Sequence, residues 1–214
     1  FRNFNFAFHG GAMLWNGNNG TLKNCNFINN TASDGGAIIF AGNNNILSDS
    51  TFINNTAITG YGGAIFWNGA NGSLTSSNFA NNHVHNSGGA IRWNGANGTL
   101  SNSIFTNNNA SYGGAVYWNL NGVNGKIISS TFTDNTATNV GGAIYWEPTG
   151  HMINCIFNNK KWTRSNGIYA QDNLIINSGN GIADIFVNHT LSGISIVVLN
   201  NETYYYPPNT NINS

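Results

Sequence analysis

Charged side chains are scarce in this sequence. Only 7% of the 214 residues are charged, and seven lysines and arginines balance seven aspartates and glutamates, whereas a globular domain ordinarily carries about a quarter charged residues. A chain without a basic cluster has nothing to neutralise a row of phosphates, so we expect no nucleic-acid partner. No block of like charge marks a tail that binds a membrane surface.

Long apolar runs, proline and helical periodicity are also missing. No run of about 18 apolar residues marks a membrane-spanning helix, so we expect no direct membrane insertion by this segment. Proline is nearly absent before Pro207 and Pro208, and no stretch shows sustained helical spacing of apolar residues. The first residues, FRNFNFAFHG, contain no signal peptide, and we interpret the sequence as part of a longer chain.

Asparagine, glycine and aromatic residues are abundant instead. The sequence contains 44 asparagines and 27 glycines, while 40% of the residues are hydrophobic and 13% are aromatic. Asparagine and glycine are poor helix formers and favour turns. The apolar content is sufficient for a buried core. This composition favours turns and hydrogen-bonded ladders over helices.

One phrase recurs six times, with Gly-Gly-Ala followed by an aliphatic, a variable and an aromatic residue. We call it the glycine phrase. Its copies begin at Gly10, Gly35, Gly62, Gly88, Gly113 and Gly141, so successive copies are 25 to 28 residues apart. Periods in this range are typical of repeat architectures.

A second phrase lies between these copies and centres on a phenylalanine. The phenylalanines are Phe27, Phe52, Phe79, Phe105, Phe132 and Phe157. The residues two positions later are Asn29, Asn54, Asn81, Asn107, Asp134 and Asn159. We expect the asparagines among them to form a ladder, in which each side-chain amide bonds to its copies on the neighbouring repeats.

The two phrases predict an all-β parallel β-helix, with about 26 residues and three short β segments in each coil. Six clear coils and atypical C-terminal coils form a repeat domain at 1–187. Residues 188–214 either cap this solenoid or begin a following domain. Within the glycine phrase, strand alternation places the aliphatic and aromatic residues inside and the variable residue outside.

The register also predicts the state of the two cysteines. Cys25 and Cys155 occupy the same repeat position five coils apart, which corresponds to about 24 Å along the axis. A disulfide requires Cα atoms within about 7 Å of each other. We therefore expect two free, buried thiols.

The variable residues of the glycine phrase form a stripe on the outside of successive coils. Phe66, Arg92, Tyr117 and Tyr145 belong to this stripe. Exposed aromatic residues in a row are typical of a surface that packs on sugar rings or on a protein partner. We predict that these four residues bind the partner. The alternatives are that the long turns cover them, or that exposed aromatic residues are merely tolerated on these strands.

Catalytic and metal sites are not expected. Glycoside hydrolysis needs two carboxylates at a defined separation, but Asp34 and Asp49 lie far along the axis from Asp134 and Glu147. His83 and His85 share a strand face without further ligands nearby. We predict no catalytic residue, no metal and no cofactor.

Acceptor motifs for N-glycosylation are frequent, as chance predicts for this composition. Asn71 and Asn97 lie in NGANG turns, which the predicted fold exposes, and we expect them to be the better acceptors. Asn29 and Asn54 are expected to lie in the ladder, where a glycan does not fit.

The GGAI and FxxN motifs resemble the repeat of chlamydial polymorphic outer-membrane proteins. The FINNTA and WNG phrases and the asparagine content are similar to the adhesin-like surface proteins of methanogenic archaea. The resemblance covers about residues 1–187. It implies a right-handed parallel β-helix in a large secreted or surface-anchored protein, whose partner is a glycan or protein on a host or neighbouring cell.

The first functional hypothesis is therefore a non-enzymatic cell-surface adhesin. The alternatives are a polysaccharide lyase or hydrolase on the same fold, and a purely structural spacer or filament subunit. A cleft with converging carboxylates favours the enzyme, and a face without exposed aromatic residues favours the spacer.

Overall fold

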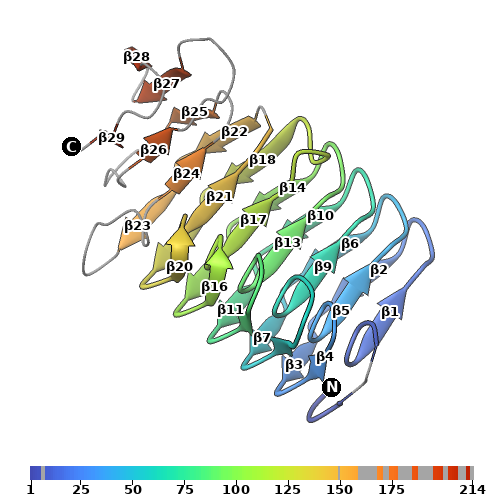
Figure 1. The fold of residues 1–214 in the computed structure, drawn as a ribbon. Coiled ribbons are helices and arrows are strands. Elements are labelled where there is room, and N and C mark those ends of the chain that lie inside the picture. The colour runs from blue at the N-terminus through green and yellow to red at the C-terminus, as the bar shows by residue number, and fades with distance from the viewer. Residues whose placement is uncertain are drawn as a thin grey trace.

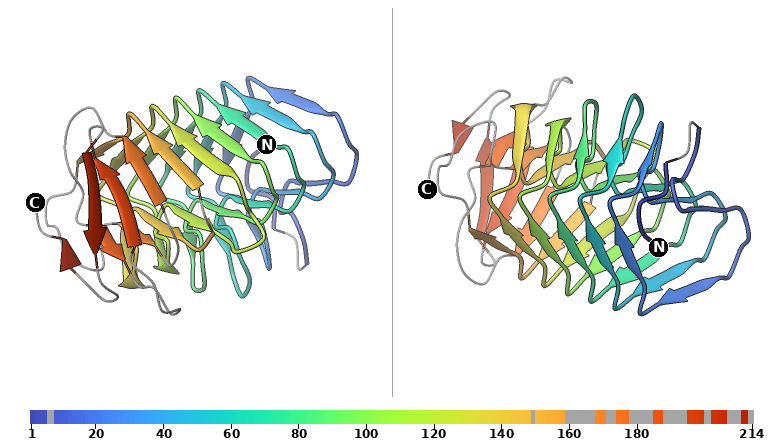
Figure 2. Two further views of the ribbon diagram at one scale, coloured as in Figure 1. Left: turned by 90° about the horizontal axis from the view of Figure 1, so that it is seen from above. Right: turned by 90° about the horizontal axis from the view of Figure 1, so that it is seen from below.

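The computed structural model is a parallel β-helix, whose coils stack along one axis (Figures 1 and 2). It describes residues 1–5, 8–148 and 150–158, together with the backbone of short strands between 168 and 212. Every regular element among these described residues is a strand. The predicted fold class is confirmed.

Equivalent strands of successive coils pair in parallel and build four sheets. The first sheet contains β1 (Met13–Trp15), β5 (Ile38–Phe40), β9 (Ile65–Trp67), β13 (Ile91–Trp93), β17 (Val116–Trp118), β21 (Ile144–Trp146), β24 (Ile168–Ala170) and β26 (Ile185–Val187). The second contains β2 (Thr21–Lys23), β6 (Ile46–Ser48), β10 (Ser73–Thr75), β14 (Thr99–Ser101), β18 (Gly125–Ile128), β22 (Gly150–Ile153) and β25 (Leu174–Asn177). The third contains β3 (Asn26–Ile28), β7 (Thr51–Ile53), β11 (Asn78–Ala80), β15 (Ile104–Thr106), β19 (Thr131–Thr133) and β23 (Ile156–Asn158). The fourth contains β4 (Thr31–Ala32), β8 (Thr56–Ala57), β12 (His83–Val84), β16 (Asn109–Tyr112) and β20 (Thr136–Val140).

A coil thus has four strands, not the three that the sequence predicted. The stretch SLTSSNF is divided at Ser76, whose φ of 51° lies in the left-handed region and turns the chain between β10 and β11. The equivalent residue has positive φ in all six coils, at Asn24, Asp49, Ser76, Asn102, Ser129 and Asn154. The corner was missed because serine also occurs in strands.

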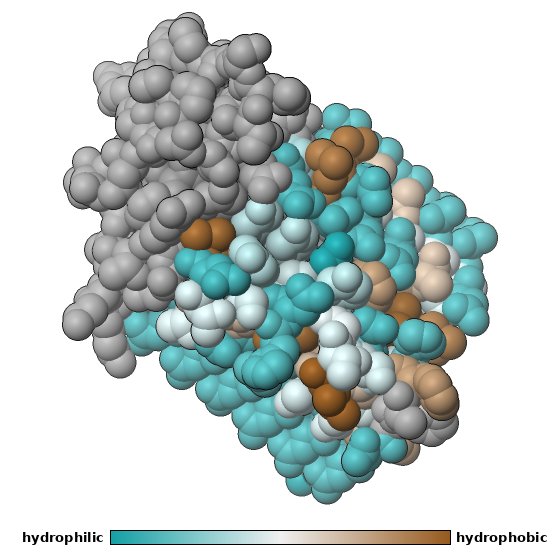
Figure 3. All heavy atoms as spheres, viewed as in Figure 1, coloured by the Kyte–Doolittle hydropathy of each residue, from teal (hydrophilic) through white to brown (hydrophobic). Residues whose placement is uncertain are grey.

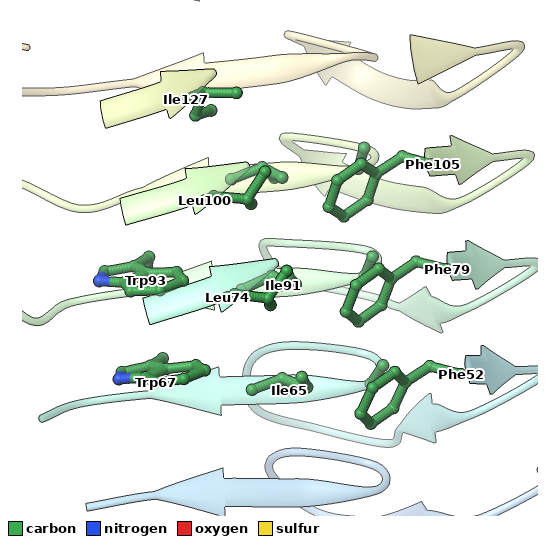
Figure 4. Close-up of a cluster of buried hydrophobic side chains, with 14 of the residues drawn as sticks. Phe52, Ile65, Trp67, Leu74, Phe79, Ile91, Trp93, Leu100, Phe105 and Ile127 are labelled. Carbon is green, nitrogen blue, oxygen red and sulfur yellow. The ribbon is translucent and has the colours of Figure 1, made fainter. Parts of the chain in front are cut away.

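The core consists of columns of like side chains. Neighbouring rings from Phe27 to Phe157 stack with centroids 4.7–5.2 Å apart, close to the spacing of paired strands. The indoles from Trp67 to Trp146 stack at 4.5–4.9 Å. Figure 4 shows the two aromatic columns with aliphatic side chains between them. Burial of these apolar side chains stabilises the stack by about 25 cal/mol per Å².

A buried asparagine ladder runs along the coils one residue later than predicted. Its members are Asn30, Asn55, Asn82, Asn108 and Asn135, which are all fully buried. Asn82 Nδ2 donates to Asn108 Oδ1 and to the Phe52 carbonyl, each at 3.0 Å. The predicted ladder residues Asn29, Asn54, Asn81, Asn107 and Asp134 have positive φ instead and form a corner. Because this corner turns the chain, the side chain that follows points inward. Asn159 lies outside the described residues.

Both cysteines are free, as predicted. They share a column with serines such as Ser77, whose Oγ accepts from the backbone N–H of Ser50 in the preceding coil at 3.2 Å. Cys155 is buried, but Cys25 is only half-buried. The expectation of two buried thiols is therefore wrong for Cys25. It lies in the first coil, where no complete coil among the described residues covers it on the N-terminal side.

The strands beyond residue 158 extend the stack. β24 and β26 continue the first sheet and β25 continues the second. β27 (Ser195–Leu199) and β28 (Glu202–Tyr206) form an antiparallel hairpin, and β29 (Asn211–Ile212) pairs antiparallel with β26. The division into a repeat domain at 1–187 and a cap or following domain at 188–214 stays a prediction.

Candidate functional site

The predicted stripe lies on the outer face of the first sheet. Phe66, Arg92 and Tyr117 are paired in register on β9, β13 and β17, and each is half-buried. Tyr145 follows in register on β21 but is only 6% exposed. The expectation that Tyr145 is an exposed residue is therefore wrong. A role of these four residues in binding stays a prediction.

A second column runs beside the stripe and consists of the residue directly before each Gly-Gly pair. In chain order its members are His9, Asp34, Tyr61, Ser87, Tyr112 and Val140. Tyr112 packs edge-on against Tyr145 with ring centroids 5.7 Å apart, and Val140 packs against the same ring. These neighbours cover Tyr145. Sequence reasoning missed this column, although its fixed place before Gly-Gly was a usable signal.

Arg92 lies between two tyrosines from the coils on either side. Its Cζ is 3.9 Å from the ring centroid of Tyr61 and 4.8 Å from that of Tyr117. Its Nη1 donates to Ser87 Oγ at 2.6 Å, and its Nε donates to Asn94 Oδ1 at 3.1 Å. Cation–π attraction holds the guanidinium between the two rings. The stripe is thus a packed cluster and not a row of independent side chains.

Tyr117 joins this cluster to Glu147. Its ring stacks on Tyr145 with centroids 4.6 Å apart, and its hydroxyl donates to Glu147 Oε1 at 2.6 Å. Burial raises the pKa of Tyr117 well above its usual value, and the hydrogen bond and negative charge of Glu147 raise it further. Glu147 Oε2 accepts from Asn119 Nδ2 and the Leu120 N–H. This carboxylate therefore fixes one end of the stripe.

Other acidic side chains pair at the surface. Asp34 Oδ2 lies 3.3 Å from His9 Nδ1, and Asp49 Oδ2 lies 3.7 Å from Lys23 Nζ. The rings of His83 and His85 are 5.8 Å apart. In the part of the chain that the structure describes, no three His, Cys, Asp or Glu residues are grouped so that they could hold a metal ion.

A shallow groove lies at the corner between the second and third sheets, and sequence reasoning did not find it. Its volume is about 380 Å³, and its lining residues are Asp49, Ser50, Thr51, Ser76, Ser77, Asn78, Asn102 and Ile104. The lining offers hydroxyl and amide groups but a single carboxylate. It therefore lacks the two carboxylates that glycoside hydrolysis needs.

Asn71 and Asn97 lie in exposed turns. They belong to an outer amide ladder, in which Asn97 Nδ2 donates to Asn71 Oδ1 at 3.1 Å and Asn71 Nδ2 donates to Asn44 Oδ1 at 2.9 Å. Their use as glycan acceptors stays a prediction. Asn29 and Asn54 are also exposed, so the reason given for excluding them is wrong.

Among the described residues, no helix is long and apolar enough to cross a membrane.

Comparison with known proteins identifies one family of similar repeats. Neither the curated proteins nor the solved structures gave a match. The Chlamydia polymorphic membrane protein repeat matches residues 49–66 and 129–145. Each matched segment runs from a strand of the third sheet, through the corner at Asn54 or Asp134, to the next glycine phrase. The chain therefore carries repeats similar to those of the chlamydial proteins.

Proposed function

We propose that this chain is a segment of a non-enzymatic, adhesin-like surface protein that attaches to glycans or proteins on a host or neighbouring cell. The observation that carries the proposal is the repeat match at 49–66 and 129–145 within a β-helix. Because the matched repeat is that of a membrane protein, it supports an extracellular location at a cell surface. The asparagine-rich phrases support an origin among methanogenic archaea.

The outer face of the first sheet is the proposed binding face. It places aromatic rings beside amides and one guanidinium on neighbouring strands. On the face of the molecule drawn in Figure 3, hydrophobic residues are scattered among hydrophilic ones and form no continuous apolar patch. A cluster of aromatic rings bordered by polar groups suits a glycan, whose own surface alternates C–H groups and hydroxyls.

The alternatives make different demands on the molecule. A lyase or hydrolase needs converging carboxylates, and the groove at Asp49 supplies one. A spacer needs no aromatic side chains on its faces, whereas Tyr112 is 38% exposed beside the stripe. Both observations favour the adhesin.

The test is binding of the purified segment to a panel of cells and to a glycan array. We expect Phe66→Ser and Tyr117→Ser to weaken binding by about tenfold or more, because they remove rings from the proposed face. The matched control is Ile104→Ser on the third sheet, where the side chain is 50% exposed. If all variants bind equally well, the binding site lies on another face of the molecule. If the segment binds no cell and no glycan, the result favours the structural spacer.

A further inference from the structure

We propose that Arg92 and its flanking tyrosines form a site for the carboxylate of an acidic sugar, such as a uronic or sialic acid residue within a glycan. This inference rests on the proposed function and names the ligand class for the same face. It starts from the unused hydrogen-bonding capacity of Arg92.

The guanidinium of Arg92 has N–H donors that no described residue accepts from. It carries five N–H donors, and two of its nitrogens donate, one to Ser87 Oγ and one to Asn94 Oδ1. Among the described residues, no carboxylate lies within ion-pair distance of it. Glu147 sits two coils further along the stack and is engaged by Tyr117, Asn119 and Leu120. Three of the five N–H donors therefore remain for a ligand, and an anion supplies the charged acceptor that the guanidinium lacks among these residues.

The surroundings hold this guanidinium in one orientation. Tyr61 and Tyr117 contact its faces from the two neighbouring coils. With both faces occupied, the remaining donors point along the guanidinium plane, which is the direction a carboxylate needs for two parallel hydrogen bonds. A ligand therefore meets a fork whose orientation is already fixed.

The neighbouring column adds one exposed ring beside this fork. Ser87 lies between Tyr61 and Tyr112 in the column that precedes the Gly-Gly pairs, and Arg92 itself contacts Tyr61 and Ser87. Tyr112, one coil beyond Ser87, is 38% exposed. Its ring offers a surface for the C–H face of a sugar whose carboxylate meets Arg92. A free acidic peptide offers the carboxylate without the ring.

The direct test is titration of the purified segment with matched glycans. The probes are uronate- and sialate-terminated oligosaccharides, the methyl esters of the same compounds, sulfated counterparts and poly-glutamate, with binding measured by calorimetry. We expect the carboxylated glycans to bind and their methyl esters to bind about tenfold or more weakly, because esterification removes the charge and an acceptor oxygen. Sulfated glycans and poly-glutamate should bind more weakly than the carboxylated glycans.

Substitutions of Arg92 distinguish the contribution of the planar guanidinium from the contribution of its positive charge. Arg92→Lys keeps the charge but loses the planar fork, and we expect it to weaken binding of the carboxylated glycans by about tenfold. Arg92→Gln should weaken it further. The matched control is Lys126→Gln, which removes one exposed positive charge from the second sheet and should leave binding unchanged. Thermal unfolding of each variant verifies that it is folded.

Four outcomes would overturn the inference: no binding by any carboxylated glycan, equal binding of acids and esters, preference for sulfate or poly-glutamate, or unchanged binding by Arg92→Gln. The proposed function is judged separately. If cells still bind Arg92→Gln but not Phe66→Ser, the face remains an adhesive one and only the ligand class is wrong.

Discussion

Burial decides the chemistry of the two cysteine side chains. Cys155 is fully buried, whereas Cys25 is half-buried. Alkylation requires a thiolate that the reagent can reach. We therefore expect iodoacetamide at about pH 8 to modify Cys25 in the folded protein and Cys155 only after unfolding. Mass spectrometry of the digested protein measures both sites, and equal labelling of the two would contradict the described burial.

The same burial links stability to pH. It raises the pKa of the Cys155 thiol from 9.0 to about 11, even though two backbone contacts lower it. Below about pH 9 the thiol is protonated in both states, and above this pH the unfolded chain ionises first, so the free energy of unfolding falls as pH rises toward 11. We expect the loss to reach about 1–2 kcal/mol. When urea unfolding is compared at both ends of the range, Cys155→Ser should lose about 1–2 kcal/mol less than the parent protein, because ionisation of other groups such as Tyr117 is common to both.

Two tryptophans of one column differ in a single hydrogen bond. Trp93 Nε1 donates to the Gly95 carbonyl at 3.1 Å, whereas the buried Nε1 of Trp67 has no partner. Trp93→Phe and Trp67→Phe remove the same ring volume, but only the former leaves a carbonyl unpaired. We expect Trp93→Phe to cost about 1 kcal/mol more stability. Urea unfolding followed by circular dichroism measures the difference, and equal costs would mean that this hydrogen bond contributes nothing.

At the scale of one coil, the turn after the first strand is matched to the aromatic residue that ends the strand. Where this residue is Trp67, the turn ends at Gly72, and a β-carbon there would collide with the indole. Where it is Phe40, the equivalent turn residue is Asn45, which is fully buried. Asn45 Oδ1 accepts from the Gly20 N–H, and its Nδ2 donates to the carbonyls of Gly17 and Gly42. A smaller ring and a larger turn residue thus fill the same space.

This match predicts a strong coupling between two substitutions. Phe40→Trp alone should cost about 1–3 kcal/mol through overpacking against Asn45. Asn45→Gly alone should cost about 2–3 kcal/mol, because it breaks three hydrogen bonds and leaves a cavity. The double variant recreates the combination found at Trp67 and Gly72, so it should be at least about 1 kcal/mol more stable than the sum of the losses predicts. A double-mutant cycle in urea measures this term, and simple additivity would refute the match.

Positions that repeat one residue type could be predicted from the sequence, because like side chains at a fixed spacing stack in only one register. The phenylalanine column follows from that rule, and the alignment of Phe66, Arg92 and Tyr117 follows because each lies between an aliphatic residue and a tryptophan that do repeat. The buried ladder could not be predicted from that rule, because Asn81 and Asn82 are the same residue type. The positive φ of Asn81, which the sequence does not show, decides that Asn82 is the side chain that points inward. The contact of Arg92 with Tyr61 was also missed, because it joins different repeat positions on neighbouring coils.

The described part of the chain from β1 to β23 is a one-dimensional stack. Its strands pair with equivalent strands of adjacent coils, as with Phe79, whose neighbours in register are Phe52 and Phe105. In such a stack, the free energy of unfolding is close to a sum of the stability of each coil and the interaction energy of each pair of adjacent coils. A destabilising substitution in a central coil therefore divides the stack into an N-terminal and a C-terminal block of coils.

Phe79→Ala tests this picture on the 214-residue segment. The ring stacks on Phe52 at 4.7 Å and on Phe105 at 4.8 Å, so its removal weakens two interfaces at once and should cost about 3–5 kcal/mol. Three or more repeats are needed for independent stability, and the block before this coil has only two complete glycine-phrase coils. We therefore expect hydrogen exchange to accelerate most between residues 10 and 57, while the coils from β13 to β22 stay protected.

The control is Ile104→Ala, at an exposed position of the third sheet, which should leave hydrogen exchange unchanged throughout. A uniform loss of protection in Phe79→Ala would instead show that the stack unfolds as one cooperative unit.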